Sequence, residues 1–144
     1  MTAKSYLNQM RLLDIKITDG IEELAQLKAL ATKVTAALDG EAVSSSKSPD
    51  KMTDVVAKII KLQEYINGAV DKYVDRKREA LELLSKVTNP VHYKILHSRY
   101  VLYKTWEQIA DEIGYTYQWT CQLHGGALQE FEKIMKNSGL LDRN

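Results

Sequence analysis

The chain has 144 residues, of which 44% are hydrophobic and 27% are charged, so it is long enough and apolar enough to bury a core. Its formal net charge of +1 excludes the strongly basic body that binds nucleic acid without discrimination. Only two prolines and seven glycines interrupt a sequence rich in Ala, Leu, Lys, Glu and Ile, and this composition predicts an all-α fold.

The sequence contains no targeting segment that we recognise. Residues 1–13 include Lys4 and Arg11 and lack the continuous apolar stretch of a signal peptide. No run of about 18 or more apolar residues occurs, so we expect no membrane span. The single Cys121 has no partner for an intrachain disulfide, which is typical of a reducing compartment. These observations predict a cytoplasmic protein.

Apolar residues recur every seven positions between residues 3 and 38. One row contains Met10, Ile17, Leu24, Ala31 and Leu38, and the second contains Leu13, Gly20, Leu27 and Val34. This repeat predicts a long amphipathic helix. Glycine costs about 1 kcal/mol at an interior helical position, so a kink or local break can form near residues 18–20.

A second heptad repeat follows a polar segment. Residues 39–50 combine Gly, Ser and Pro and predict a loop, with Asp50 as the N-cap of the next helix. That helix is expected over residues 51–87, with Met52, Ile59, Ile66, Tyr73, Ala80 and Val87 in one row and Val55, Leu62, Ala69 and Leu83 beside it. Two such helices predict a coiled-coil-like antiparallel hairpin. Because two helices bury little surface, we expect a second copy of the chain to pair with them.

The composition changes at Asn89-Pro90. A capping Asn followed by Pro at the first helical position predicts a new helix. Five of the eight tyrosines and both tryptophans lie between Tyr93 and Trp119, which indicates a small domain with an aromatic core. We therefore predict two domains, an oligomerisation or partner-binding hairpin over residues 1–88 and a DNA-binding domain over residues 89–144.

The pattern after residue 104 predicts a helix-turn-helix. Thr105 stands three residues before Gln108, the spacing of a capping box, and Gly114 supplies the turn between helices. Ala110 is small where a second helix would cross, and Thr116 caps that helix. We expect Trp106, Ile109, Ala110 and Ile113 to face inward, with Ile109, Ile113, Tyr115 and Leu123 packing the two helices together. A helical hairpin without any DNA-binding role needs the same small residue and the same glycine.

Two sets of residues are candidates for contact with DNA. The start of the second helix would present Thr116, Tyr117, Gln118, Cys121 and Gln122 to bases in the major groove. A leading helix commonly lies across the phosphate backbone, where the candidates are Lys94, Arg99 and Lys104. From Asn89 onward, six Lys and Arg residues are balanced by six Asp and Glu residues, so binding would rest on local clusters, dimerisation or a partner.

The string TWEQIADEIGYTYQWTCQLHGGALQEF, residues 105–131, resembles the fourth-region helix-turn-helix of bacterial sigma factors. It resembles more closely the C-terminus of a phage-encoded family related to the RinA and ArpU late transcriptional regulators. The resemblance extends to Ala3–Gln9, Leu13-Asp14, Ser48–Met52, Ala57–Ile59, Leu96 and Arg99-Tyr100. It implies a phage or prophage protein that acts on transcription in the cytoplasm of a bacterial host.

The chain departs from that family at two positions. Members of that family resemble the pattern W-V-Y-R-[IL]-H-G-R-A-L, which aligns with residues 119–128 of this chain. Gln122 and Gly126 stand where the pattern has its two arginines. Gln122 can still pair with adenine, but two positively charged contacts are lost, and the paired glycines loosen the helix by up to about 2 kcal/mol. We therefore predict weak DNA affinity for the monomer.

Chemistry beyond binding has no support in the sequence. Cys121 and His124 share a helical face, but a zinc site needs about four ligands and no second pair lies nearby. His92 and His97 do not share a face, and no catalytic dyad or phosphate-cradling glycine loop occurs. We expect neither an enzyme activity, nor a bound metal, nor a cofactor.

These patterns predict a transcriptional regulator that binds double-stranded DNA as a homodimer. The sigma-like pattern adds host RNA polymerase as a candidate partner. A dimer would require an operator with two half-sites. The alternative is a phage assembly or partner-binding scaffold that does not read bases, including a packaging protein that resembles a small terminase subunit.

Overall fold

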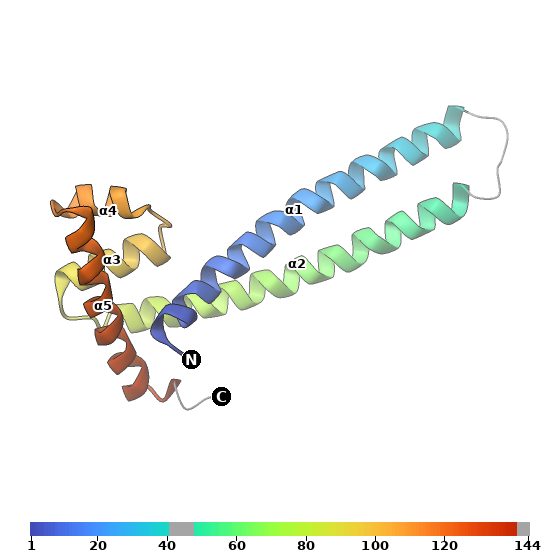
Figure 1. Cartoon of the computed structure of the whole chain (residues 1–144). Helices are drawn as coiled ribbons and strands as arrows, with labels where there is room; N and C mark the ends of the chain where they lie inside the picture. The colour runs from blue at the N-terminus through green and yellow to red at the C-terminus, as the bar shows by residue number, and fades with distance from the viewer. Residues whose placement is uncertain (41–47, 141–144) are drawn as a thin grey trace. The chain divides into compact units, whose positions relative to one another are not determined.

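The computed structural model describes residues 1–40 and 48–140 of the chain. These residues form helices and no strand, so the predicted all-α class is confirmed for the described ranges (Figure 1). In chain order the helices are α1 (Ala3–Gly40), α2 (Ser48–Leu84), α3 (Pro90–Tyr100), α4 (Trp106–Ile113) and α5 (Tyr117–Asn137). Of the loop predicted over residues 39–50, residues 41–47 lie outside the described residues. Among the described helices, none is both long and apolar enough to cross a membrane.

Packing divides the chain into two compact units. Unit 1 contains residues 1–12 and 73–144, and unit 2 contains residues 13–72. The packing thus divides α1 and α2, each of which contributes one end to unit 1. The predicted division between residues 88 and 89 falls inside unit 1, and it remains a prediction about independent domains.

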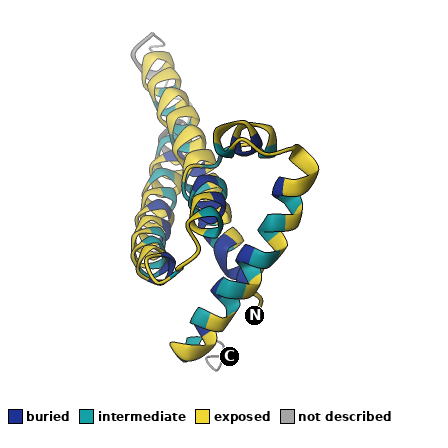
Figure 2. Ribbon diagram, turned by 90° about the vertical axis from the view of Figure 1, so that its left-hand side faces the viewer, coloured by how far each residue is buried: buried dark blue, intermediate teal, exposed yellow. Residues whose placement is uncertain are grey.

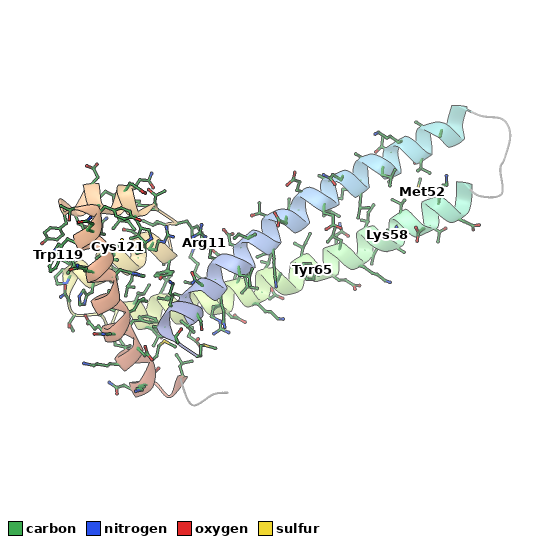
Figure 3. All side chains as sticks on the ribbon, in the orientation of Figure 1. Arg11, Met52, Lys58, Tyr65, Trp119 and Cys121 are labelled. Carbon is green, nitrogen blue, oxygen red and sulfur yellow. The ribbon has the colours of Figure 1, made fainter. Side chains whose placement is uncertain are left out.

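Unit 2 follows the heptad rows of the sequence. Within residues 13–37 and 50–72, every row member is buried or half-buried, while Ile15 and Ile21 lie outside the rows and are exposed. Tyr65 also lies outside the rows and is exposed (Figure 3). Helix α1 is continuous through residues 18–20, so it has no break at the glycine. Gly20 is buried, and a Cβ at that position would lie 3.0 Å from Cγ1 of Ile66. Its missing side chain therefore allows close approach of the Ile66 side chain.

The start of α2 differs slightly from the prediction. The helix begins at Ser48, so Asp50 lies in its first turn and is not the N-cap. Its carboxylate still lies where the partial positive charge of a helix N-terminus favours a negative side chain. The predicted end at residue 87 is also three residues too late, since α2 ends at Leu84.

Unit 1 is held by one apolar core to which both ends of the sequence contribute. Its buried members come from α1, α2, α3 and α5, and they are Ala3, Tyr6, Leu7, Met10, Ala80, Leu83, Leu84, Leu96, Tyr100, Ala127, Phe131 and Met135. The Tyr6 and Phe131 rings lie 6.0 Å apart between centroids. The Tyr6 hydroxyl donates a 2.6 Å hydrogen bond to Glu79, so its buried polar atom is satisfied. Residues 1–12 are therefore part of the same core as α5.

Candidate nucleic-acid interface

Side-chain caps fix the starts of α3 and α4 as the sequence predicted. The Asn89 side chain accepts hydrogen bonds from the backbone N–H groups of Val91 and His92 at 2.9 and 3.2 Å. Thr105 and Gln108 form a reciprocal capping box, with bonds of 2.9 and 3.2 Å. Each cap satisfies backbone donors that have no partner within the helix. The local sequence therefore determines where these helices begin.

A glycine turn connects α4 to α5. Gly114 has φ of 75°, the left-handed conformation that glycine adopts without a steric penalty. Thr116 is the N-cap of α5 and accepts from the backbone N–H of Trp119 at 3.1 Å. Ile109 and Ala110 are buried behind this turn, as predicted. The α4–turn–α5 segment is thus defined by two caps and one backbone conformation.

One residue near the turn was placed wrongly. Tyr115 was expected to pack the two helices together, but 46% of it is exposed. It lies between the two helices, at a position that belongs to neither, so the helical periodicity used to orient it does not apply there. The other inward positions, Trp106, Ile113 and Leu123, are half-buried.

The predicted base-reading residues lie at the start of α5, where buried and exposed residues alternate at helical spacing (Figure 2). Tyr117, Gln118 and Gln122 are exposed, while Cys121 is half-buried. Cys121, beside the Tyr117 hydroxyl, raises the pKa of that tyrosine. The Thr116 hydroxyl accepts the capping bond, so this atom is engaged in holding the helix.

Sequence reasoning assigned no role to Trp119, which is 48% exposed (Figure 3). Together with Tyr115 and Tyr117 it places three exposed aromatic side chains at the turn and the first turn of α5. The exposure of Trp119 agrees with the burial of the next residue, Thr120, because adjacent helical residues face different directions. Exposed large aromatic side chains are enriched in interfaces with other macromolecules.

The predicted phosphate-contacting residues already have partners within unit 1. Lys104 and Lys94 bind the two carboxylate oxygens of Glu112, with Nζ–O distances of 2.7 and 3.6 Å. The hydrogen bond from Lys104, together with the two positive charges, lowers the pKa of Glu112. The Arg99 guanidinium lies 4.8 Å from the centroid of the Trp106 ring and donates to the Lys104 carbonyl at 3.0 Å. The structure thus brings Lys94 and Lys104 together on one acidic side chain, while Arg99 contacts the Trp106 ring and the Lys104 backbone.

A cluster of rings connects α3, α4 and α5. Burial raises the pKa of Tyr100 to about 12, so its hydroxyl keeps its proton, and the hydroxyl oxygen forms a hydrogen bond of 2.8 Å with His124 Nε2. The His124 ring also meets the Trp106 ring edge-on, with centroids 4.5 Å apart. Burial, together with the charges of Lys4 and Arg99, lowers the pKa of His124 to about 4. His124 is therefore a neutral packing residue at neutral pH.

This histidine should make folding stability depend on pH. Between its folded pKa of about 4 and its ordinary value of 6.5, the unfolded chain binds more protons, so stability is complete above about pH 6.5 and is lost as the pH falls. Solvent partly screens the effect, and we expect a loss of about 1–2 kcal/mol between pH 7 and pH 5. Urea titrations across this range measure it. His124→Gln should flatten the profile, leaving the smaller contribution of His97, whose pKa burial also lowers. An unchanged slope in that variant would show that His124 does not titrate as inferred.

The second glycine of the Gly125-Gly126 pair faces α3. A Cβ at Gly126 would lie 3.3 Å from Nε2 of His92. Nδ1 of His92 in turn lies 2.8 Å from a carboxylate oxygen of Glu130, and the Thr88 N–H donates to the same carboxylate at 2.8 Å. Although burial opposes the shift, the hydrogen bonds from His92 and Thr88 lower the pKa of Glu130. The missing side chain at residue 126 thus leaves room for the His92 ring within unit 1.

The described ranges contain no group of three or more His, Cys, Asp or Glu side chains that could hold a metal ion. Comparison of the chain with protein-family models found no match, and comparisons with curated proteins and with solved structures found none either.

Proposed function

We propose that this protein is a phage or prophage transcriptional regulator whose α4–turn–α5 segment is a helix-turn-helix that binds double-stranded DNA. The observation that carries the proposal is the exposure of Tyr117, Gln118 and Gln122 directly after a capped glycine turn. An α-helix fits the major groove of B-DNA, and residues near the start of a recognition helix contact base edges there. In this arrangement α5 is the recognition helix, and α3 and α4 support it.

The side chains at the start of α5 suit base recognition. Gln118 and Gln122 stand four residues apart, so they share one face of the helix. A glutamine amide can donate to and accept from adenine, while Tyr117 offers a ring and a hydroxyl. The resemblance to the RinA- and ArpU-related family supports the same assignment, with Gln122 in place of an arginine. Specificity would then rest on hydrogen bonds more than on charge.

Dimerisation of unit 2 completes the proposal. Val55, Ile66 and Ala69 are the buried apolar side chains that the structure describes between residues 13 and 72, which is a thin core for two long helices. Val56, Ile60 and Val70 are exposed along α2 and would pack against a second copy of an antiparallel hairpin. The dimer would place two recognition helices on half-sites about one DNA turn apart. It would also compensate for a weakly charged monomer.

Selection of bound fragments from random DNA tests the proposal at low salt. We expect an enriched motif with two half-sites, and we expect Gln118→Ala combined with Gln122→Ala to abolish it, since each bidentate contact contributes about 1–3 kcal/mol of discrimination. Gln129→Ala is the matched control, because Gln129 is exposed on the same helix about two turns further along. Failure of the wild-type protein to enrich any motif at low salt would contradict the proposal.

A scaffold that binds another protein is the second candidate function. Two observations favour it, namely the engagement of Lys94 and Lys104 by Glu112 and the exposed ring of Trp119. Aromatic side chains are enriched in protein interfaces, and neutralised lysines attract DNA weakly. A packaging protein similar to a small terminase subunit would assemble into a ring, which light scattering distinguishes from a dimer. Host RNA polymerase is a candidate partner in either case.

A further inference from the structure

Two lysines from different parts of unit 1 meet on one carboxylate. Lys94 belongs to α3, Lys104 precedes α4, and Glu112 lies near the end of α4. The ammonium groups contact different oxygens of Glu112, with the shorter distance, 2.7 Å, from Lys104. The arrangement resembles a small anion site in which both oxygens of the anion are engaged.

The backbone around Lys104 holds this arrangement in place. The Lys104 N–H donates to the Ser98 carbonyl at 2.9 Å, and its own carbonyl accepts from Arg99 at 3.0 Å. Arg99 is held in turn by its position over the Trp106 ring. Lys104 is therefore positioned by the fold, although its side chain remains 28% exposed and can reach a ligand from solvent.

We propose that Lys94 and Lys104 form a binding site for one phosphodiester group of the DNA backbone, and that Glu112 occupies the anion position when DNA is absent. The inference rests on the proposed function and adds a competition between Glu112 and DNA. A carboxylate and a phosphodiester each carry one negative charge shared by two oxygens, so the phosphate can replace the carboxylate on the same two ammonium groups. Exposed ion pairs of this kind contribute little to stability, so replacing the Glu112 carboxylate by a phosphate costs little free energy.

The exchange has a clear consequence for affinity. In the wild-type protein the two lysines must leave Glu112 before they can neutralise a phosphate and release its counterion. Removing the Glu112 charge should make both lysines available in the free protein. Binding should then become tighter, because neither lysine has to leave Glu112 before it contacts the phosphate. The salt dependence should change little, because the same phosphate is neutralised in both complexes.

Glu112→Gln in the full-length chain tests the inference. Fluorescence anisotropy with a labelled duplex carrying the selected motif, between about 50 and 200 mM salt, should show affinity about 5- to 10-fold tighter than that of the wild-type protein. The slope of log K against log salt should stay within about one unit of the wild-type value, because the two lysines contact the same single phosphate in both proteins. Adding Lys94→Ala and Lys104→Ala to the Glu112→Gln variant should remove the gain.

Asp111→Asn is the matched control, because Asp111 is an exposed carboxylate on the same helix and the structure records no ion pair for it among the described residues. It removes one negative charge without releasing either lysine, so we expect a change of less than about 2-fold. An equal gain for the two variants would overturn the anion site while leaving DNA binding intact. If no variant binds the duplex even at low salt, both the anion site and the proposed function fail.

Discussion

A fragment containing only residues 89–144 is expected to be largely unfolded at room temperature. Seven of the twelve buried members of the unit 1 core, from Ala3 to Leu84, lie outside this fragment. Without them Phe131 and Met135 would expose most of their apolar surface, and burial of each such side chain contributes about 1.5–3 kcal/mol. Circular dichroism should show low helix content and no cooperative thermal transition.

The control for this fragment keeps the whole core. Replacing residues 13–72 by a flexible Gly-Ser linker retains residues 1–12 together with α3, α4 and α5. That protein should unfold cooperatively. A fragment of residues 89–144 that melts as cooperatively as the linked protein would show that the predicted domain boundary at residue 88 is also a boundary of folding.

Phe131→Ala is expected to destabilise the protein more than any other single substitution proposed for this chain. The Phe131 ring is fully buried and packs against Tyr6 at a centroid distance of 6.0 Å. Removing it deletes apolar contacts and leaves a cavity, which lowers the free energy of unfolding by about 3–5 kcal/mol. Urea denaturation followed by circular dichroism at 222 nm measures the loss. The midpoint should fall while the slope of the transition stays constant, as expected of two-state unfolding.

Trp119→Ala provides the comparison on the same helix. Trp119 is also a large aromatic residue, but 48% of it is exposed, so its loss should change the free energy of unfolding by less than about 1 kcal/mol. A similar loss in the two variants would mean that burial within unit 1 does not determine the cost. The same variant also shows whether an exposed aromatic side chain contributes to binding, since its fold should be intact.

Local patterns in the sequence predicted the local structure well. The caps at Asn89, Thr105 and Thr116 and the turn at Gly114 depend on residues within four positions of one another, and the structure has all of them. The heptad rows correctly identified the covered faces of α1 and α2 in unit 2. These features could be predicted because hydrogen bonding near a helix end and helical periodicity are short-range properties.

The packing of residues 1–12 could not be predicted in this way. Nothing near Tyr6 in the sequence indicates that its ring meets Phe131 and that its hydroxyl meets Glu79, because these partners are far along the chain. The heptad pattern marks Met10 as a covered position but does not say which element covers it. Long-range contacts of this kind depend on how all the helices pack.

The candidate site shows the same division between local and long-range features. The exposure of Gln118 and Gln122 follows from helical spacing, and the structure agrees with it. The pairing of Lys94 and Lys104 with Glu112 joins three residues across a loop and a helix, so only the two lysines could be singled out beforehand. The sequence indicated only that Gly126 lacks the charge of an arginine. It did not indicate that Gly126 packs against the His92 ring.

Unit 1 is assembled from two segments that are far apart in the sequence, residues 1–12 and 73–144, and this separation affects folding during protein synthesis. Residues 1–12 leave the ribosome before their partner Phe131 is translated, so Tyr6 has an incomplete core to pack against until then. Contacts between such distant residues slow folding, and an apolar segment exposed during that wait can be bound by chaperones or associate with other chains. Slower translation of the codons between Tyr6 and Phe131 would therefore lengthen the period in which the nascent chain is vulnerable to aggregation.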